Sequence, residues 1–223
     1  MKLVCISDLH GLLHNLEEDG DILIIAGDIC PATNHDIIFQ REWLENECKP
    51  WLQEMRKKFG HILFTPGNHD FIFEPASLHY KMLRPVIDFV PVLPWTVLID
   101  EAIEIMGVKF YGTPWTNQYY NWAFMREETA LSFIFSDIPD DTQVLISHGP
   151  PHGIGDRAAR GKRGGSTSLL ARIKELKELK ACIFGHIHEG KRKVLDYPGN
   201  LCYNVSLLDD RYESVFEPTI LEI

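Results

Sequence analysis

Apolar runs long enough to cross a membrane are absent from the 223-residue sequence, as are internal repeats and low-complexity tracts. CxxC pairs are also absent, and the five cysteines are an odd number. Cys5 and Cys182 lie inside apolar runs, where cysteine is usually a small buried hydrophobe, so we expect free thiols in a reducing compartment. The chain reaches the charged Asp8 too early for a secretory signal peptide. These absences predict a cytoplasmic protein that does not bind membranes.

Positive charge is scarce, because 22 lysines and arginines stand against 32 acidic residues, a formal net charge of -10. A uniformly acidic surface repels nucleic-acid phosphates, so we expect no stable complex with nucleic acid. A small phosphate ester stays compatible with this charge, because bound cations would place positive charge at one point. No stretch has the composition of a linker, so the sequence predicts a single domain over residues 1–223. Nothing in it specifies an oligomeric state.

Short apolar runs bounded by Gly, Pro, Asp or His predict strands buried on both faces. These runs cover residues 2–7, 21–26, 61–65, 143–147 and 181–185. Amphipathic periodicity predicts helices over residues 36–59, interrupted at Pro50, and 166–179, capped by Ser166 or Thr167.

Other segments have the pattern of additional β-structure. We expect a meander over residues 97–99, 102–106 and 109–111, with a turn at Gly107, and further strands over 194–197, 201–205 and 219–223. The alternation of elements predicts an α/β fold in which two packed β-sheets are flanked by helices.

Chemically informative residues follow the ends of the five buried runs. They lie in Ser7-Asp8-Leu9-His10-Gly11, Gly27-Asp28, Gly67-Asn68-His69-Asp70, Ser147-His148-Gly149 and Gly185-His186-Ile187-His188. Because ligands in open α/β sheets bind beyond the carboxyl ends of strands, we expect these segments to converge on one cavity. Carboxylate, imidazole and amide ligands suit Mn, Fe, Zn, Co or Ni and suit Ca poorly. Asp8 alone could be a helix cap, Gly27-Asp28 a turn and His148 a hydrogen-bonded core histidine, but the ordered occurrence of the motifs favours a metal site.

This ordered set resembles the calcineurin-like metallophosphoesterase superfamily over residues 8–188. Three segments are similar to its small metallophosphoesterase-domain-containing branch, which acts on phosphodiesters, including cyclic nucleotides: Gly112-Thr113-Pro114-Trp115, Ser147-His148-Gly149-Pro150-Pro151 and Phe184-Gly185-His186-Ile187-His188-Glu189-Gly190. The resemblance implies a four-layer sandwich with two mixed sheets. It also implies a dinuclear metal-dependent phosphoric ester hydrolase, in which a hydroxide that bridges the metals attacks phosphorus.

The resemblance implies seven metal ligands and one catalytic residue. Asp8, His10 and His188 would bind the first metal. Asn68, His148 and His186 would bind the second metal, and Asp28 would bridge both. His69 would be the catalytic histidine beside the leaving group. Two Mn²⁺ ions are the first expectation, with Fe, Zn, Co or Ni as alternatives.

The segment after Gly27-Asp28 departs from the protein Ser/Thr phosphatase branch. That branch continues with an Asp-Arg pair, whereas this chain has Ile29-Cys30, so a bidentate clamp on a terminal phosphate dianion is missing. We therefore predict hydrolysis of a small phosphodiester, with a cyclic nucleotide as a candidate. The alternatives are a nuclease or phosphomonoesterase of the same superfamily, or a non-catalytic metal-binding scaffold.

Several polar and aromatic residues keep two interpretations each. Asp70 either fixes the tautomer of a histidine ligand or stabilises its own turn. An aromatic loop either stacks on a nucleobase or packs on the core; its residues are Trp115, Asn117, Tyr119 and Tyr120. His152 either touches substrate or faces solvent, and the segment from Arg157 to Arg163 is either a lid or a solvated loop.

Overall fold

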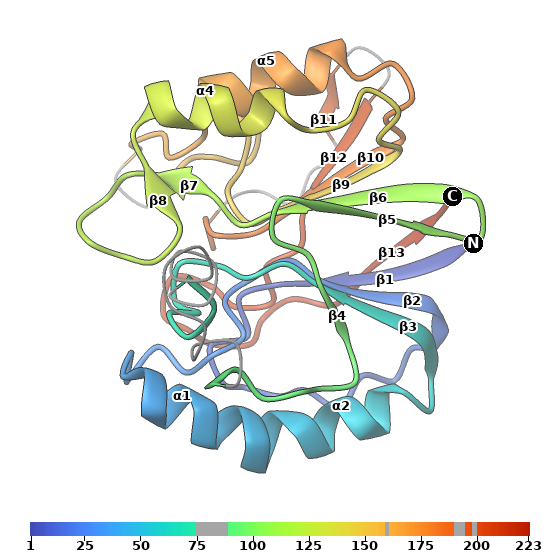
Figure 1. Cartoon of the computed structure of the whole chain (residues 1–223), viewed down its shortest axis with the longest axis vertical. Helices are drawn as coiled ribbons and strands as arrows, with labels where there is room; N and C mark the ends of the chain where they lie inside the picture. The colour runs from blue at the N-terminus through green and yellow to red at the C-terminus, as the bar shows by residue number, and fades with distance from the viewer. Residues whose placement is uncertain (75–88, 159–160, 190–194, 198–199) are drawn as a thin grey trace.

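Two β-sheets pack face to face in the centre of the molecule, and helices cover the two outer faces (Figure 1). The structure is a computed structural model that describes residues 1–74, 89–158, 161–189, 195–197 and 200–223. The four layers follow from sheets that are apolar on both faces, because each face must be buried against another element. This confirms the expected α/β sandwich of two packed mixed sheets.

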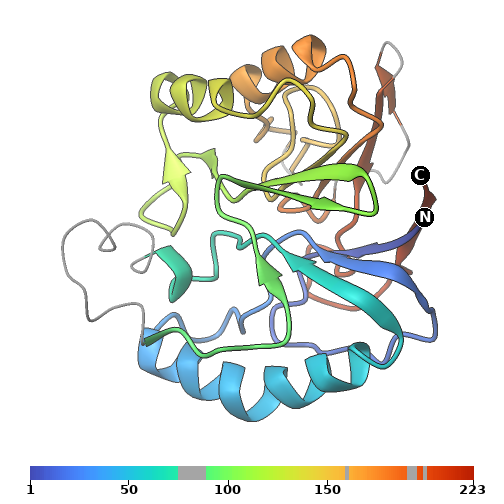
Figure 2. The ribbon, with the colours of Figure 1, turned by 45° about the vertical axis from the view of Figure 1, so that its right-hand side comes forward.

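The first sheet has the strand order β13-β1-β2-β3-β4, in which β1 to β4 run parallel and β13 pairs antiparallel with β1. Its strands are β1 (Lys2–Ile6), β2 (Gly20–Ile25), β3 (Phe59–Phe64), β4 (Thr96–Val97) and β13 (Thr219–Glu222). The amino group of Met1 donates a hydrogen bond to the carbonyl of Ile223 (2.8 Å), so the two ends of the chain lie side by side (Figure 2).

The second sheet has the order β11-β12-β10-β9-β6-β5, with parallel pairing from β12 to β6 and antiparallel strands at both edges. Its strands are β5 (Glu101–Ile105), β6 (Val108–Thr113), β9 (Val144–Ser147), β10 (Ala181–Phe184), β11 (Leu195–Tyr197) and β12 (Asn200–Asn204). A small separate pair consists of β7 (Thr116–Asn117) and β8 (Met125–Arg126). All five predicted buried runs are therefore strands, three in the first sheet and two in the second.

Helices cover the outer faces of both sheets. They are α1 (Ile37–Trp43), the π-helical turn η1 (Leu44–Cys48), α2 (Lys49–Met55), α4 (Glu128–Ser136) and α5 (Thr167–Glu175). The interruption expected at Pro50 is confirmed as a π-helical turn just before α2, whose first turn holds the proline where its missing N–H costs least. Ser166, and not Thr167, caps α5 by accepting a hydrogen bond from the N–H of Leu169 (3.1 Å).

One expectation about the middle of the chain is wrong, and one helix there was not predicted. The expected meander is a single hairpin of β5 and β6, because β4 pairs with β3 in the first sheet. Met106 and Gly107 close this hairpin with positive φ angles of 53° and 77°, as a two-residue turn requires. Helix α4 was not predicted, because it buries only Leu131 and Phe135, which are too few positions for a periodic signal.

The core between the sheets is apolar and contains no disulfide among the described residues. It includes Leu3, Ile22, Ile24, Leu63, Phe110, Val144, Ile146 and Ile183. All five cysteines are buried free thiols, as expected. The described residues contain no helix that is long and apolar enough to span a membrane.

Candidate metal centre

The five loops that follow β1, β2, β3, β9 and β10 meet at one end of the two sheets. Hydrogen bonds join them directly: the Asp8 N–H donates to the Gly27 carbonyl (3.0 Å), and the His10 N–H donates to the Asp28 carbonyl (2.9 Å). The Gly185 N–H donates to the carbonyl of His148 (3.0 Å). The sequence prediction that these strand ends converge is therefore confirmed, because parallel strands bring their carboxyl ends to the same edge.

Four of the candidate ligands have left-handed backbone conformations. They are Asp8, His10, Asp28 and His186, with φ angles of 55°, 46°, 54° and 68°. Such conformations cost a non-glycine residue about 1–3 kcal/mol each and persist only where the surroundings hold them. Such strained residues cluster at active sites and ligand sites, so their concentration here favours a functional role for this end of the sheets.

Asp8, His10 and His188 form the first cluster of ligand atoms. All three side chains are buried, and one ligand atom of each lies within 4.8 Å of the others. Nε2 of His188 is 3.2 Å from Nε2 of His10 and 3.4 Å from Oδ1 of Asp8. The Asp8 carboxylate also accepts hydrogen bonds from the Ser7 hydroxyl (2.6 Å) and the His186 N–H (3.0 Å to Oδ2).

Asp28, His148 and His186 form the second cluster, again with ligand atoms within 4.8 Å of one another. Nε2 of His148 is 3.3 Å from Oδ2 of Asp28 and 3.0 Å from Oδ1 of Asn68. The same Asp28 oxygen is 3.8 Å from Nε2 of His10 in the first cluster. Asp28 therefore lies between the two clusters, at the position that a bridging carboxylate requires.

Backbone carbonyls orient two of the histidine rings. Nδ1 of His148 is 2.9 Å from the carbonyl of Ala26, and Nδ1 of His188 is 2.9 Å from the carbonyl of Asp209. Because a carbonyl can only accept, each Nδ1 donates, and in the neutral ring Nε2 keeps a lone pair directed at the clusters. Convergent lone pairs and carboxylate oxygens repel one another unless a cation lies between them, so this donor set fits divalent metal ions.

The electrostatics of the buried groups agree with this arrangement. Burial alone would lower the pKa values of His148 and His188, but the Asp28 and Asp8 carboxylates beside them raise both to about 9. Burial lowers the pKa of His10 to about 4. Burial alone would raise the pKa of Asp28, but His148 and His69 hold it well below its usual range. The site thus concentrates ionised carboxylates that, in the absence of metal, are balanced by protons on histidine.

Two glycines permit the close approach of these loops. A Cβ at Gly27, where φ is +97°, would lie 2.2 Å from Nδ1 of His148. A Cβ at Gly185 would lie 2.2 Å from Oδ2 of Asp8. No other residue fits without displacing a candidate ligand.

Asp70 ties the Asp28 loop to the Gly67 loop. Its buried carboxylate accepts backbone N–H hydrogen bonds from Asp28 (2.9 Å), Ile29 (3.4 Å), Cys30 (2.9 Å) and Gly67 (2.8 Å). Its role is therefore to stabilise turns, and the alternative in which it fixes a histidine tautomer is wrong. The tautomers of His148 and His188 are instead set by backbone carbonyls, which no side-chain pattern can reveal.

His69 adjoins both clusters. Its Nε2 is 4.0 Å from Oδ2 of Asp28, and its ring centroid is 4.6 Å from that of His10. The buried Gln40 of α1 donates to its carbonyl (2.7 Å), and Nε2 of His35 is 3.1 Å from its Nδ1. Trp122 packs against the same ring, with centroids 4.4 Å apart.

Gln40, His35 and Trp122 were not singled out from the sequence. The signal for Gln40 was a polar residue on the apolar face of the helix, three residues after Ile37 and four before Leu44. His35 and Trp122 follow no strand end and carried no signal of their own.

Tyr212 also borders the site and was likewise not singled out. Its ring lies 4.8 Å from that of His10 and 5.2 Å from that of His188, centroid to centroid. Its φ angle is 63°, and its N–H donates to the Asp209 carbonyl that also receives Nδ1 of His188. The turn at residues 209–213 therefore positions a candidate ligand and an aromatic side chain together.

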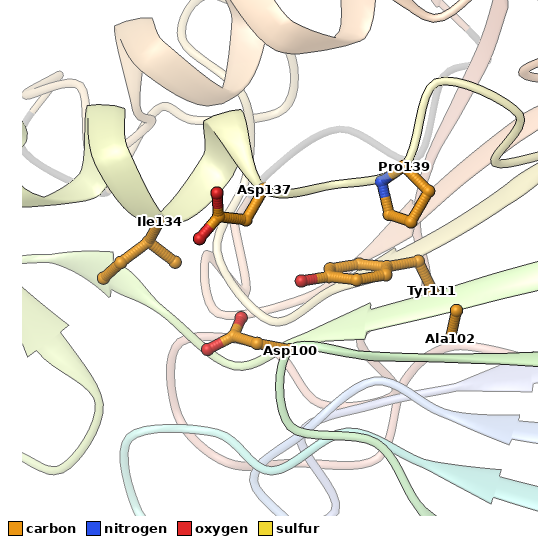
Figure 3. Close-up of a pocket in the computed structure, with 6 residues that line it drawn as sticks. All are labelled: Asp100, Ala102, Tyr111, Ile134, Asp137 and Pro139. Carbon is orange, nitrogen blue, oxygen red and sulfur yellow. The ribbon is translucent and has the colours of Figure 1, made fainter.

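The aromatic loop divides into a buried and an exposed part. Trp115 is only 8% exposed, and its Nε1 donates to Oδ2 of Asp100 (2.5 Å), so it packs on the core and is not available to stack on a substrate. Asp100 also lines a separate cavity of about 340 Å³, together with Tyr111 and Asp137 (Figure 3). Tyr119 and Tyr120 are exposed and contact each other, and Asn117 donates to Glu128.

The basic segment from Arg157 to Arg163 is tied down at its base. Arg163 donates to the buried Asp156 carboxylate (2.6 Å), and Arg157 and Arg163 pair as an antiparallel bridge. Residues 159 and 160 lie outside the described residues. Nδ1 of His152 lies 3.7 Å from Oδ2 of the same Asp156, so its observed neighbour is this carboxylate.

Comparison with known proteins extends over the whole chain. The human metallophosphoesterase domain-containing protein 1 is 27% identical over 244 residues, which cover 100% of this chain and 71% of that protein. A Caenorhabditis elegans protein of the UPF0046 group is 32% identical, covering 85% of this chain and 64% of its own length. Another UPF0046 protein of C. elegans is 28% identical, and this chain spans 60% of its length.

A solved crystal structure with 18% identity aligns at a TM-score of 0.60 and covers 91% of this chain and 89% of its own, which shows the shared fold. The model of the calcineurin-like phosphoesterase family matches residues 1–190, a segment that contains every candidate ligand. The chain therefore belongs to the calcineurin-like phosphoesterase family.

Proposed function

We propose that this chain is a phosphodiesterase that hydrolyses a small phosphodiester with two divalent metal ions, of which Mn²⁺ is the first choice. One observation carries the proposal: a single oxygen of Asp28 lies 3.8 Å from Nε2 of His10 in one buried cluster and 3.3 Å from Nε2 of His148 in the other. Two metal ions held in this way lie about 3.5–4 Å apart in enzymes that clamp both oxygens of an in-line displacement.

The proposed ligands follow the two clusters. Asp8, His10 and His188 would hold the first metal, Asn68, His148 and His186 would hold the second, and Asp28 would be shared by both. Asn68 contributes a carbonyl oxygen, since its Oδ1 faces Nε2 of His148. The mixed nitrogen and oxygen set accepts Mn, Fe, Zn, Co or Ni.

The metal ions, when bound, supply the charge that activates a water and stabilises the phosphate oxygens. The reaction forms one phosphorus–oxygen bond to that water and breaks the bond to the leaving alkoxide, so no covalent bond to the protein is needed. His69 carries the proton that the leaving oxygen takes up, because its Nε2 borders the Asp28 oxygen shared by both clusters.

The choice of a diester rests on the segment after Asp28. The N–H groups of Asp28, Ile29 and Cys30 all donate to Asp70, and no arginine follows Asp28 to clamp a terminal phosphate. A dianionic monoester would lack that charge-assisted contact, whereas a monoanionic diester needs it less. A cyclic nucleotide is the candidate we favour within this class.

Three further parts of the proposal concern the domain organisation, the compartment and the substrate class. We treat residues 1–223 as one metallophosphoesterase domain, because both sheets contribute ligands to one site. We place it in the cytoplasm, because all five cysteines are buried free thiols. The net charge of -10 supports a small-molecule substrate over a stable nucleic-acid complex.

A metal-by-substrate screen of the purified chain tests the proposal. Bis(p-nitrophenyl) phosphate is offered with Mn²⁺, Fe²⁺, Zn²⁺, Co²⁺ or Ni²⁺, and we expect turnover that disappears in His186→Ala. Faster cleavage of p-nitrophenyl phosphate would favour the phosphomonoesterase alternative, and preference for single-stranded DNA over cyclic AMP would favour the nuclease. A protein that binds two metal ions without any turnover would be a scaffold.

A further inference from the structure

His35 lies directly behind the proposed catalytic histidine. Its Nε2 is 3.1 Å from Nδ1 of His69, on the side of that ring opposite Nε2. Trp122 packs against both of these rings, at centroid distances of 4.9 Å to His35 and 4.4 Å to His69. Phe71 contacts His35 from another side (5.0 Å).

The backbone around His35 is held in place by its neighbours. The N–H of Asp36 donates to Oδ1 of Asn34 (2.9 Å), and Asp36 caps α1 by accepting from the N–H groups of Ile38 and Phe39 (2.9 and 3.1 Å). His35 therefore stands at the start of a capped helix whose next turn carries Gln40, the residue that holds the His69 carbonyl (2.7 Å). One helix start fixes both the ring and the backbone of His69.

We propose that His35 is a positioning residue whose Nε2 shares a hydrogen bond with Nδ1 of His69 and thereby holds that ring with Nε2 facing the reacting groups. Two imidazole nitrogens 3.1 Å apart share one proton, and the protonation of His69 sets the direction of the bond. When His69 carries the proton that the leaving oxygen takes up, its Nδ1–H donates and His35 accepts; after that proton has left, His35 can donate. In both states the contact fixes a ring whose Nε2 lies 4.0 Å from Oδ2 of Asp28. The expected effect on turnover rests on the proposed function, whereas the hydrogen bond between His35 and His69 does not.

Two substitutions separate the hydrogen bond from the packing. His35→Phe keeps a ring against Trp122 and removes the hydrogen-bonding nitrogen, whereas His35→Gln places an amide, which can donate or accept, near the position of Nε2. We expect kcat for diphenyl phosphate to fall about 10–100-fold in His35→Phe, because general acid catalysis contributes about 10²–10⁴-fold. KM and bound metal should be unchanged, and His35→Gln should recover most of the loss. His61→Phe, at an exposed histidine of β3, is the matched control and should retain the parent kcat.

The leaving group provides a readout that a merely structural role would not change. p-Nitrophenolate departs without a proton, whereas phenolate and alkoxide departures need one. The loss in His35→Phe should therefore be small for bis(p-nitrophenyl) phosphate, larger for diphenyl phosphate and largest for cyclic AMP. In a His69→Ala background, His35→Phe should cause no further loss, because the two residues act as one unit. Equal losses for all three substrates, or an additive loss in the double variant, would overturn the inference.

Nuclear magnetic resonance of the Zn²⁺-loaded protein tests the hydrogen bond without turnover. Two-bond ¹H–¹⁵N spectra should show the same Nδ1 shift of His69 in the parent and in His35→Gln, and a shifted Nδ1 signal in His35→Phe, where the hydrogen bond is lost. An Nδ1 shift of His69 that is identical in the parent and in His35→Phe would refute the inference. If the parent hydrolyses none of these esters, the proposed function fails, and the spectra still decide the role of His35.

Discussion

The substitution Asp70→Asn tests whether one buried carboxylate holds the metal centre together. Oδ2 of Asp70 accepts from the N–H groups of Asp28, Ile29 and Gly67, and Oδ1 accepts from that of Cys30 (2.9 Å). In the isosteric asparagine, the single side-chain oxygen can accept either from the three N–H groups at Oδ2 or from the one at Oδ1. The amide nitrogen then faces the remaining backbone N–H, and two donors meet without an acceptor. Hydrogen bonds to a charged acceptor contribute about 1.5–3 kcal/mol, so we expect a loss of about 2–4 kcal/mol in the free energy of unfolding.

The assay is differential scanning calorimetry of the metal-free protein, followed by metal titration. For a chain of this size, the expected loss lowers Tm by about 4–16 °C. Metal affinity should fall about 10–100-fold, because the backbone of the bridging Asp28 loses its anchor. Asp19→Asn is the control, since this carboxylate is 80% exposed and forms a surface ion pair with Lys2; it should change stability by less than about 0.5 kcal/mol. Parent-like melting and metal binding in Asp70→Asn would show that the four hydrogen bonds do not assemble the site.

Three further outcomes follow from the same geometry. Asp28→Ala should lose both metal ions, and elemental analysis that still finds two equivalents would contradict the bridge. His69→Ala should retain metal and lose about 10²–10⁴-fold in kcat for diphenyl phosphate, so parent-like turnover would exclude it as the acid. Because the pKa values of His148 and His188 are raised to about 9, both are protonated in the metal-free protein at neutral pH, and a metal ion must displace these protons. Their stabilisation of the metal-free fold is complete below about pH 6.5 and is lost as pH rises through about 9, whereas metal affinity rises over that window. Calorimetric Zn²⁺ titration in buffers of different ionisation enthalpy should detect proton release at pH 7.5, and its absence would contradict the assignment.

The convergence of the ligands was predictable because it depends on a property of the backbone. Apolar runs such as residues 21–26 mark buried strands, and the polar residues that follow them must lie at one edge if the strands are parallel. The proximity of Asp28 and His148 could therefore be predicted although 120 residues separate them in the sequence. The order of the motifs then supplied the family resemblance.

The residues that hold the ligands could not be predicted in the same way. His188 is oriented by the carbonyl of Asp209, and a backbone carbonyl has no signature in the side-chain sequence. His35 reaches His69 only because the connection after β2 folds back beside the β3 loop, which depends on tertiary structure. The placement of β4 failed for a related reason, since a two-residue strand carries too little pattern to choose between two sheets.

The turn at residues 209–213 lies outside the segment that matches the family model, which ends at residue 190. Its Asp209 carbonyl nevertheless sets the hydrogen bond behind a ligand, and its Tyr212 walls the same cluster. Substitutions in this turn can therefore change the basicity of the His188 imidazole and the aromatic wall beside it while all seven candidate ligands stay in place. The reactivity of this centre is thus open to adjustment from a part of the chain that lies outside every motif.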